Sequence, residues 1–563
     1  MVVNGVLRTL WVNIPHRVRF MDVRFKTAPK GMLAFRRVRK RAVLKTISSR
    51  VRQHAELTDI DGSLAEINVE SPACGARSKT TIVRKPQWSK SFFYRYYMRR
   101  LGNKNESLWT FILYCARLAL FLHHETGRNR RLGVLSPYNR LKNKRKYMTD
   151  NHNSSAYEIM APVGSRESLA AAIKAGADSI YFGIEALNMR AHSASHFTID
   201  DLRDIAAQCA EHGMKSYLTV NTIIYDEDIP LMQRICDAAL EAGISAIIAS
   251  DVAVMTYCRS IGQEVHLSTQ LNISNVEALR FYAQFADVAV LARELSLDKV
   301  THIHEAIERE NICGPKGEQV RIEMFCHGAL CMAVSGKCYL SLDNLGRSAN
   351  RGECMQVCRR SYTVCDRETG VELDVDNKYI MSPKDLKTIG FIDRMMEAGV
   401  RVFKIEGRAR PAEYVYTVVT CYKEAIQAVQ DGTFTPERVE EWTKRLSTVF
   451  NRGFWDGYYL GQRLGEWSNV YGSNATEKKQ YIGKGQKYFS KLGVGEFYLE
   501  AGEFSVGDKL LIVGPTTGVI YVTATDIHGD HGPVEKATKG MRVSIPVPEK
   551  VRPSDKLYKI VKG

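Results

Sequence analysis

From residue 157 onward, short apolar runs alternate with helical patterns at a regular pitch. The run 157–162 is followed by a helix over 168–175, capped by Ser165 and ended by Gly176, and then by a second apolar run over 179–183. Strands that alternate with helices predict parallel βαβ units. Eight or nine such strands over about 250 residues indicate an α/β fold, a (β/α)8 TIM-like barrel. A doubly wound open sheet is the alternative, but no glycine-rich fingerprint follows the first strand.

Polar side chains stand at the C-terminal ends of these predicted strands, where a barrel of this type carries its active site. They are Asn221, His266, Ser268, Gln270, Arg293, His327, Glu406 and Arg408, with Arg190 in the loop after the second strand. Each one alone could instead cap the helix that follows it. Together they predict one polar mouth, whose arginines suit a small dicarboxylate through bidentate pairing.

A cysteine-rich stretch, 323–365, enters after the seventh predicted strand. It holds six of the chain's 13 cysteines, and thiolates are soft ligands that suit iron–sulfur clusters and zinc. Cys331 and Cys338 are seven positions apart, and Cys354 and Cys358 are four apart. Glycines lie close to both pairs and let the backbone approach a bulky inorganic core. These four cysteines are therefore the candidate metal ligands.

Other fates of the cysteines compete with this interpretation. Cys326 and Cys365 are expected to be buried as small apolar side chains. A disulfide framework does not suit a 563-residue chain with further cysteines scattered along it. A zinc site usually shows two C-x2-C pairs, so C-x6-C and C-x3-C favour a cluster over zinc. The radical-SAM pattern C-x3-C-x2-C is absent, because Ser361 stands where its third cysteine would be.

The net charge of +17 is distributed unevenly along the chain. Residues 1–147 hold 32 Lys and Arg against 8 Asp and Glu, so the remainder is net acidic. This basic part shows no stable periodicity, and we expect a disordered or mis-annotated extension that precedes a start at Met148. The apolar run 108–124 is short and contains Arg117, so no membrane span is expected, and the protein is expected to be cytoplasmic. Any RNA binding by the remainder must use a local basic patch.

The predicted barrel domain covers residues 148–435, and a helical connector follows over 436–482. From residue 483 to 563, short alternating runs with Gly and Asp turns predict a small C-terminal β-barrel. This domain resembles barrels appended to translation factors and RNA-modifying enzymes. It could equally serve packing or dimerisation.

Several motifs in this chain resemble those of one known family, the collagenase-like peptidase family U32. They are EMFCHGALC at 323–331, SGKCYLS at 335–341, KIEGR at 404–408 and FNRGF at 450–454. Despite the name, the resemblance implies an iron–sulfur protein that hydroxylates tRNA, ribosomal RNA or ubiquinone precursors without molecular oxygen. Within the family the chain is most similar to the branch that forms 5-hydroxyuridine at the tRNA wobble position with prephenate.

That resemblance implies specific roles for residues of this chain. Cys331, Cys338, Cys354 and Cys358 would hold a [4Fe–4S] cluster. The other roles follow from positions at the predicted mouth and only partly from the resemblance. Arg190 and Arg408 are expected to grip the acid, and Glu406 to orient an arginine or move a proton. Substrate-binding roles are expected for Asn221, His266, Gln270 and His327.

Two other functions remain open from the sequence. A peptidase needs a nucleophile with a base or a metal-activated water, and neither H-E-x-x-H nor G-x-S-x-G occurs. A Cys326/His327 pair is conceivable, but neighbouring residues on a strand point to opposite faces. A non-catalytic protein with a structural cluster is the third possibility.

Overall fold

The computed structural model describes residues 157–191, 197–362, 381–470 and 472–563, with residues 364–365, 368 and 372–373 and four strands in the first 151 residues. The chain divides into two units, Met1–Asn151 and His152–Gly563. In the first unit, β1 (Lys26–Thr27) pairs with β2 (Leu33–Ala34), and β3 (Leu64–Glu70) pairs with β4 (Arg77–Val83), both antiparallel. Apart from these four strands, the prediction of a disordered or mis-annotated extension over 1–147 falls on residues outside the described part.

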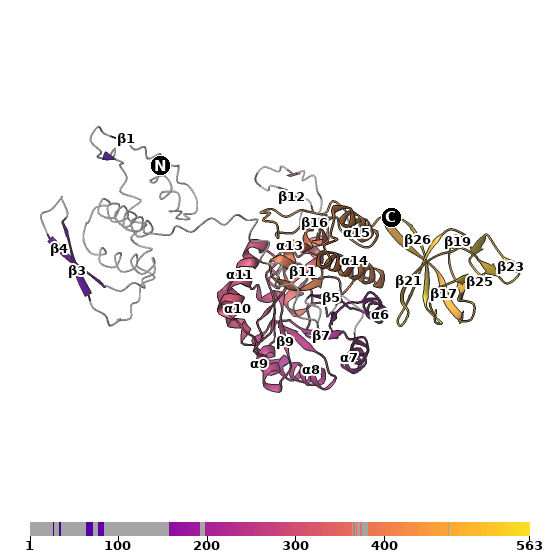
Figure 1. Ribbon diagram of the computed structural model, residues 1–563, viewed down its shortest axis with the longest axis horizontal. Helices are drawn as coiled ribbons and strands as arrows, with labels where there is room; N and C mark the ends of the chain where they lie inside the picture. Colours follow the sequence, from indigo (N-terminus) through magenta and orange to yellow (C-terminus); the bar gives the residue numbers. More distant parts are fainter. Residues whose placement is uncertain are drawn as a thin grey trace. The chain divides into compact units, whose positions relative to one another are not determined.

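Eight parallel strands of the second unit, all within its described residues, close into a barrel (Figure 1). The strands are β5 (Glu158–Pro162), β6 (Ser179–Phe182), β7 (Lys215–Val220), β8 (Ala246–Ala249), β9 (Val265–Leu267), β10 (Val288–Val290), β11 (Arg321–Ala329) and β15 (Val400–Ile405). Each pairs with its neighbour in order, and β15 pairs with both β11 and β5, which closes the ring. The predicted TIM-like barrel is therefore confirmed.

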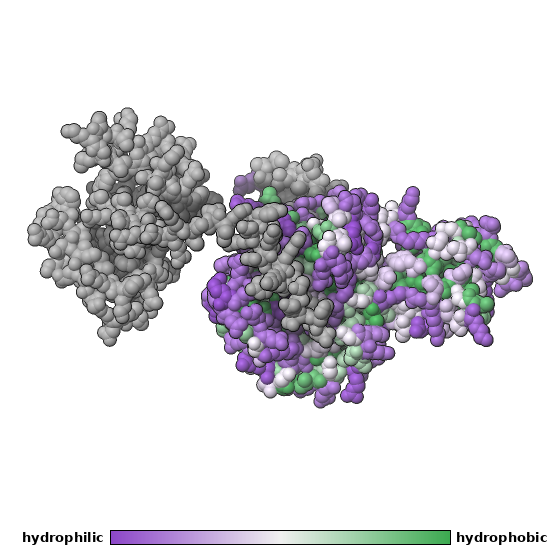
Figure 2. Space-filling model, in the orientation of Figure 1, coloured by the Kyte–Doolittle hydropathy of each residue, from purple (hydrophilic) through white to green (hydrophobic). Residues whose placement is uncertain are grey.

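Helices surround the strands because each has one apolar face to bury. They are α6 (Arg166–Lys174), α7 (Leu202–Glu211), α8 (Ile229–Glu241), α9 (Val252–Ile261), α10 (Val276–Ala283), α11 (Leu297–Glu310), α13 (Ile392–Glu397) and α14 (Ala412–Gln430). Side-chain caps start three of them: Ser165 accepts from Ser168 N, Asp251 from Ala253 N and Asn275 from Ala278 N. Figure 2 shows mainly hydrophilic residues on the outer faces of the helices that are visible there.

The strands are buried on both faces, as a parallel sheet requires. All four residues of β8, Ala246–Ala249, are buried. Tyr181, Tyr217 and Val402 belong to a small cluster inside the ring, whereas the large core fills the space between strands and helices. The interior is therefore packed, and function is confined to the ends of the barrel.

A long insertion separates β11 from β15. It contains α12 (Leu340–Leu345), the antiparallel pair β12 (Val364–Cys365) and β13 (Glu372–Leu373), and β14 (Asp385–Lys387). Strand β14 pairs antiparallel with the end of β11, and β16 (Phe454–Trp455) pairs with β14. The cysteine-rich segment therefore leaves the barrel from the C-terminal end of β11.

Helix α15 (Pro436–Thr448) leads to an antiparallel sheet domain at the C-terminus. Its strands are β17 (Glu477–Phe489), β18 (Val494–Leu499), β19 (Glu503–Ser505), β20 (Lys509–Gly514), β21 (Gly518–Thr523), β22 (His528–Gly529), β23 (Gly532–Pro533), β24 (Lys536–Thr538), β25 (Arg542–Pro546) and β26 (Lys556–Lys562). Eight of these pair in the order β21-β20-β26-β17-β18-β25-β22-β23, and β19 pairs with β24. The first strand begins at Glu477, ahead of the predicted boundary at Gly483.

One side of this sheet domain packs on the barrel. Leu511, Val513 and Val519 belong to the same core cluster as the barrel helices, whereas Phe497 and Phe504 belong to a separate core inside the domain. Among the described residues, no helix is both long and apolar enough to cross a membrane.

Candidate active site at the barrel mouth

Glu406 lies at the centre of the mouth, directly after β15. Its Oε2 accepts a hydrogen bond of 3.2 Å from the Tyr181 hydroxyl, which also donates to the Ile405 carbonyl at 2.9 Å. Its Oε1 accepts from Arg190 Nη2 at 3.2 Å. Tyr181 comes from β6 and Arg190 from the loop that follows β6. The closed ring therefore brings residues more than 200 positions apart onto one carboxylate.

Three arginines act on that carboxylate. Burial alone would raise the pKa of Glu406, but the charges of Arg190, Arg293 and Arg408 outweigh burial and lower the pKa below its ordinary value. Glu406 is therefore ionised at neutral pH. These four side chains carry a surplus of two positive charges, because three guanidinium groups face a single carboxylate.

Arg408 is held rigidly although it is almost completely buried, with 6% of its surface exposed. Its Nη1 donates to Thr219 Oγ1 at 2.7 Å and to Asn188 Oδ1 at 3.2 Å. Gly183 leaves the necessary room, because a Cβ there would lie 2.7 Å from the Arg408 Nη1. Burial lowers the pKa of Arg408, and Arg190 lowers it further, whereas Tyr181 and Glu406 act in the opposite direction.

Two of the guanidinium groups have donors left over. The buried Nε atoms of Arg293 and Arg408 find no hydrogen-bond partner among the described residues. Arg293 otherwise lies 3.8 Å above the Phe325 ring and donates to the Ala329 carbonyl at 3.3 Å. Unpaired buried donors beside surplus positive charge are the arrangement expected of an anion-binding site.

A second polar group lies at the ends of β7 and β9. Asn221 Nδ2 donates to Ser268 Oγ at 3.1 Å and to Gln270 Oε1 at 3.4 Å, and Ser268 also contacts Gln270. Asn221 Oδ1 in turn accepts from the Met189 amide at 3.3 Å. The structure thus brings together Asn221 and Gln270 as neighbours of the loop that carries Arg190.

The cysteine-rich segment lies against the loops of the mouth. A Cβ at Gly352, whose φ is +85°, would lie 2.4 Å from the Asn188 carbonyl oxygen, so only glycine permits this approach. A Cβ at Gly336 would likewise lie 2.8 Å from the Cγ of Gln270. Asn272 Nδ2 donates to the Ser335 carbonyl at 3.1 Å. The segment therefore contacts the loops after β6 and β9 and borders the arginine group.

The four candidate ligand thiols influence one another. Burial raises the pKa of the Cys358 thiol, and the neighbouring Cys331, Cys354 and Cys338 raise it further. Burial likewise raises the pKa of Cys338, again with contributions from Cys331 and Cys354. Cys354 also acts on Arg190, whose pKa is raised by Glu406 and by this thiol although burial opposes the shift. One group of thiols therefore adjoins the arginines of the mouth.

The donor set fits a soft metal centre. Cys331 is exposed and the other three are half-buried, and a metal would relieve the repulsion between their thiolates. Within the described ranges, no three or more His, Cys, Asp or Glu side chains are already placed to share one metal ion. A zinc ion with ligands at about 2.3 Å needs such convergence. The side chain of Cys365 lies outside the described residues.

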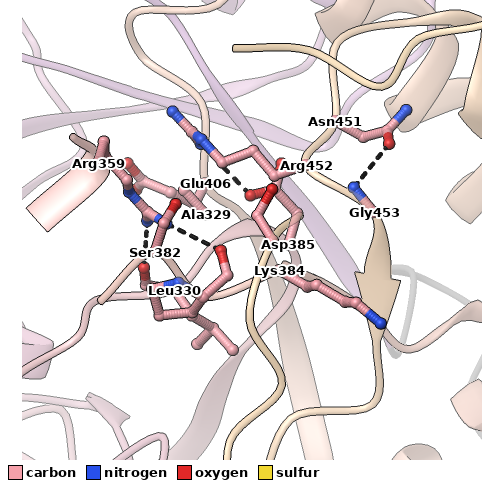
Figure 3. Close-up of polar contacts among 12 residues, drawn as sticks. Ala329, Leu330, Arg359, Ser382, Lys384, Asp385, Glu406, Asn451, Arg452 and Gly453 are labelled. Atoms are coloured by element: carbon pink, nitrogen blue, oxygen red, sulfur yellow. Dashed lines mark hydrogen bonds and ion pairs between the residues drawn. The ribbon is translucent and has the colours of Figure 1, made fainter. Parts of the chain in front are cut away.

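Arg359 fastens the cysteine-rich segment to the barrel (Figure 3). Its guanidinium donates to the Leu330 carbonyl, to Ser382 Oγ at 3.1 Å and to the Pro383 carbonyl at 2.8 Å. In the same view, Arg452 reaches Asp385 at 3.4 Å. These contacts fix the base of the segment directly beside Cys331 and Cys358.

Two predicted substrate-binding residues lie away from the mouth. His266 lies inside the barrel near the N-terminal ends of the strands, where its ring packs against Tyr217 with the centroids 4.4 Å apart and its Nε2 lies 3.4 Å from Glu264. His327 faces α14, packed among Tyr414, Tyr422 and Phe454.

A β-bulge explains the direction of His327. The register of β11 against β15 shifts between Phe325 and His327, and such a shift reverses the expected alternation of side chains. Burial, with the charges of Lys387 and Arg410, lowers the pKa of His327 to about 3, so the ring stays neutral.

Sequence reasoning missed the residues that hold the arginines in place. Tyr181, Asn188 and Thr219 all sit in or near β6 and β7, yet their partners follow β15. The only local signal was the polar residue Asn188 two positions before Arg190. These residues meet their partners only because the closed ring of strands brings the ends of β6 and β7 close to the end of β15.

A parallel barrel whose mouth gathers arginines beside a four-cysteine segment defines a class of TIM-like barrel proteins suited to an anionic substrate. The chain belongs to peptidase family U32, whose model matches residues 164–469.

Named relatives fall into two groups. The chain is 68% identical over 410 residues to a collagenase of Porphyromonas gingivalis, which covers 73% of this chain and 99% of that protein. It is 34% identical over 311 residues to tRNA hydroxylation protein P1 of Bacillus subtilis, with 54% of this chain and 71% of that protein covered. It is also 33% identical over 323 residues to the 23S rRNA 5-hydroxycytidine C2501 synthase of Escherichia coli, with 56% and 47% covered.

Proposed function

We propose that this protein is an iron–sulfur-dependent RNA hydroxylase that works without molecular oxygen and forms 5-hydroxyuridine at the wobble position of tRNA in the cytoplasm, with prephenate as co-substrate. The observation that carries the proposal is that the cysteine-rich segment packs on the loops of a mouth where Arg190 pairs with Glu406 and where Arg293 and Arg408 keep unpaired donors. The names of the relatives from Bacillus subtilis and Escherichia coli support RNA as the substrate class.

The surplus charge of the mouth matches a dicarboxylate. Two carboxylates would neutralise the two positive charges left over by Glu406, and the unpaired Nε atoms of Arg293 and Arg408 are available to them. Arg190 and Arg408 would grip the acid, and Arg293 adds a third donor. Glu406 would orient the arginines as a carboxylate, since its lowered pKa keeps it ionised.

Neutral groups complete the chemistry available from the chain itself. Burial raises the pKa of Tyr181 well above its ordinary range, with a further contribution from Glu406, so its hydroxyl remains a hydrogen-bond donor. Asn221 and Gln270 offer amide groups at the same mouth, suited to the edge of a pyrimidine. The target base must leave its stack to reach them.

Cys331, Cys338, Cys354 and Cys358 would hold the [4Fe–4S] cluster. Once bound by four cysteines, it would supply electron transfer beside the mouth. Burial lowers the pKa of Arg359 to about 10, while the charges of Cys358 and Asp385 oppose this shift. The Arg359 guanidinium would balance the negative charge of the thiolates.

Peptide hydrolysis is the second candidate, favoured by the name of the relative that is 68% identical. The candidate catalytic pair for this reaction, Cys326 and His327, is not arranged for catalysis. Burial raises the pKa of Cys326 well above its ordinary value, so this thiol is not a ready nucleophile. Its neighbour His327 donates to or accepts from Tyr422 at 3.4 Å rather than contacting the thiol.

The proposal is tested with anaerobically purified protein. Cys331→Ser, Cys338→Ser, Cys354→Ser and Cys358→Ser should each lose most of the iron and the broad absorbance near about 400 nm. Cys313→Ala, a half-exposed thiol outside the segment, is the matched control and should keep both. Incubation with unmodified tRNA and prephenate should yield 5-hydroxyuridine with the unaltered protein and with Cys313→Ala, but not with the four Cys→Ser variants. Cleavage of gelatin without hydroxylation would favour the peptidase instead.

A further inference from the structure

A shallow cleft that opens to solvent adjoins the mouth. Arg293 and Cys331 both line it, so it touches the arginine group and the thiol group at once. Three of its other lining side chains, Trp455, Tyr458 and Trp467, form an aromatic wall, and one, Glu294, is acidic. None of these three was a candidate site residue from the sequence.

The three rings converge on Gly465. A Cβ at this glycine would lie 3.4 Å from the Tyr458 hydroxyl, 3.7 Å from Trp467 and 3.8 Å from Trp455, which is ordinary van der Waals contact. The rings of Trp455 and Tyr458 meet edge to face at 5.2 Å and 79°. Edge-to-face contact is a favoured arrangement of two aromatic rings and helps to hold both in place.

The aromatic wall is anchored at its base and accessible at its rim. Trp455 is buried, and its Nε1 donates to the Lys384 carbonyl at 3.1 Å. Next to Trp467, the Ser468 amide donates to the Ser382 carbonyl at 2.7 Å. Tyr458 and Trp467 themselves are only half-buried. Rigid rings with accessible faces bind a planar ligand without a large loss of conformational entropy.

We propose that this aromatic cleft, formed by Trp455, Tyr458 and Trp467, binds an unstacked nucleobase of the RNA substrate by stacking. The inference rests on the proposed function for the choice of RNA. Aromatic faces bind bases of any sequence, and an arginine beside them supplies hydrogen bonds to base edges or phosphate. Arg293 lines the cleft and occupies that position. A base held here would lie beside both Cys331 and the acid-binding arginines.

The test is a fluorescence titration with a short uridine-rich single-stranded RNA. Stacking on Trp467 should quench tryptophan emission, and Trp467→Phe should remove that part of the signal while it keeps binding within about threefold. Trp467→Ala and Tyr458→Ala should each weaken binding about tenfold, which corresponds to about 1.4 kcal/mol. Tyr458→Phe keeps the ring and should bind like the unaltered protein.

Leu464→Ala is the matched control, because Leu464 is 84% exposed on the same segment and does not line the cleft. It should bind RNA normally, and all variants should keep their iron and their thermal midpoint. Equal RNA affinity in every variant would overturn the inference. So would quenching of Trp467 by a proline-rich peptide but not by RNA. Quenching by RNA without any hydroxylated product would retain the base site and reject the proposed function.

Discussion

The two ends of the barrel each bury a glutamate among cations, and they do so differently. At the N-terminal end, Glu158 Oε1 accepts from Ser179 and Tyr217, both at 2.8 Å. Its Oε2 accepts from Arg321 at 3.2 Å and Lys215 at 3.4 Å. Both oxygens are fully engaged by the protein itself.

At the C-terminal end, the cationic donors outnumber the carboxylate oxygens that accept from them. Three arginines act on Glu406, and two of them keep a buried Nε without a partner among the described residues. The Glu158 carboxylate is fully paired and stabilises the fold, although His266 near it keeps a buried Nδ1 without a partner among the described residues. The arginines around Glu406, which have surplus charge and unpaired donors, are instead prepared for a ligand. This agrees with the general division of labour in such barrels, with stability at one face and chemistry at the other.

The largest expected effect is on activity at the C-terminal end. Arg408→Lys should lower 5-hydroxyuridine formation about 100-fold, because an ammonium group cannot reproduce the guanidinium fork. The free energy of unfolding should fall by about 1 to 3 kcal/mol, because the buried Thr219 and Asn188 side chains lose their guanidinium donor. Product formation by mass spectrometry and urea unfolding measure the two quantities. A stable variant with full activity would remove Arg408 from the site.

The next effect is on stability at the N-terminal end. Burial alone would raise the pKa of Glu158, but Lys215, Arg321 and His266 outweigh burial and lower the pKa from 4.5 to about 2. Glu158→Gln should therefore destabilise the fold by about 3 kcal/mol. Hydroxylation per folded molecule should stay within twofold of the unaltered protein. A large loss of hydroxylation in a variant that is folded to the same extent would give Glu158 a role in the reaction. It would contradict the assignment of stability to one end of the barrel and chemistry to the other.

The same carboxylate predicts a pH dependence. A lowered carboxyl pKa contributes stability that is complete above the unfolded value and is lost as the pH falls towards the folded value. The stability difference between the unaltered protein and Glu158→Gln should therefore shrink from about 3 kcal/mol at pH 7 to about 1 kcal/mol at pH 3. Parallel urea titrations across this range measure it. A constant difference would mean that Glu158 is not the titrating group.

The smallest effect is expected at His266. His266→Gln should leave hydroxylation within twofold and lower the free energy of unfolding by about 1 kcal/mol, because the ring packs on Tyr217 far from the mouth. Activity and thermal unfolding of the purified variant measure both. A strong loss of activity would place His266 in the site after all.

The barrel could be predicted because short stretches of the sequence show the alternation of strands and helices. The arginines and Glu406 could be placed at the mouth because they follow strand ends. The directions of His266 and His327 could not be predicted. In strands buried on both faces, apolar residues do not mark which side faces inward, and the bulge in β11 has no local signature.

The contacts between distant segments were also beyond the sequence. Trp467 meets Cys331 across one cleft only because the chain returns to the end of β11 after α15. Likewise, Thr219 and Arg408 are 189 positions apart and form a hydrogen bond of 2.7 Å. Spacing along the chain predicts neither contact.

The central claim is that the mouth and its thiols modify RNA, and nucleoside analysis tests it most directly. Transfer RNA and ribosomal RNA from cells that lack this protein are digested and examined by mass spectrometry. The account predicts that 5-hydroxyuridine disappears from tRNA, returns with the intact protein and with Glu158→Gln, and does not return with Arg408→Lys. Unchanged hydroxylated nucleosides in both RNA classes would contradict it.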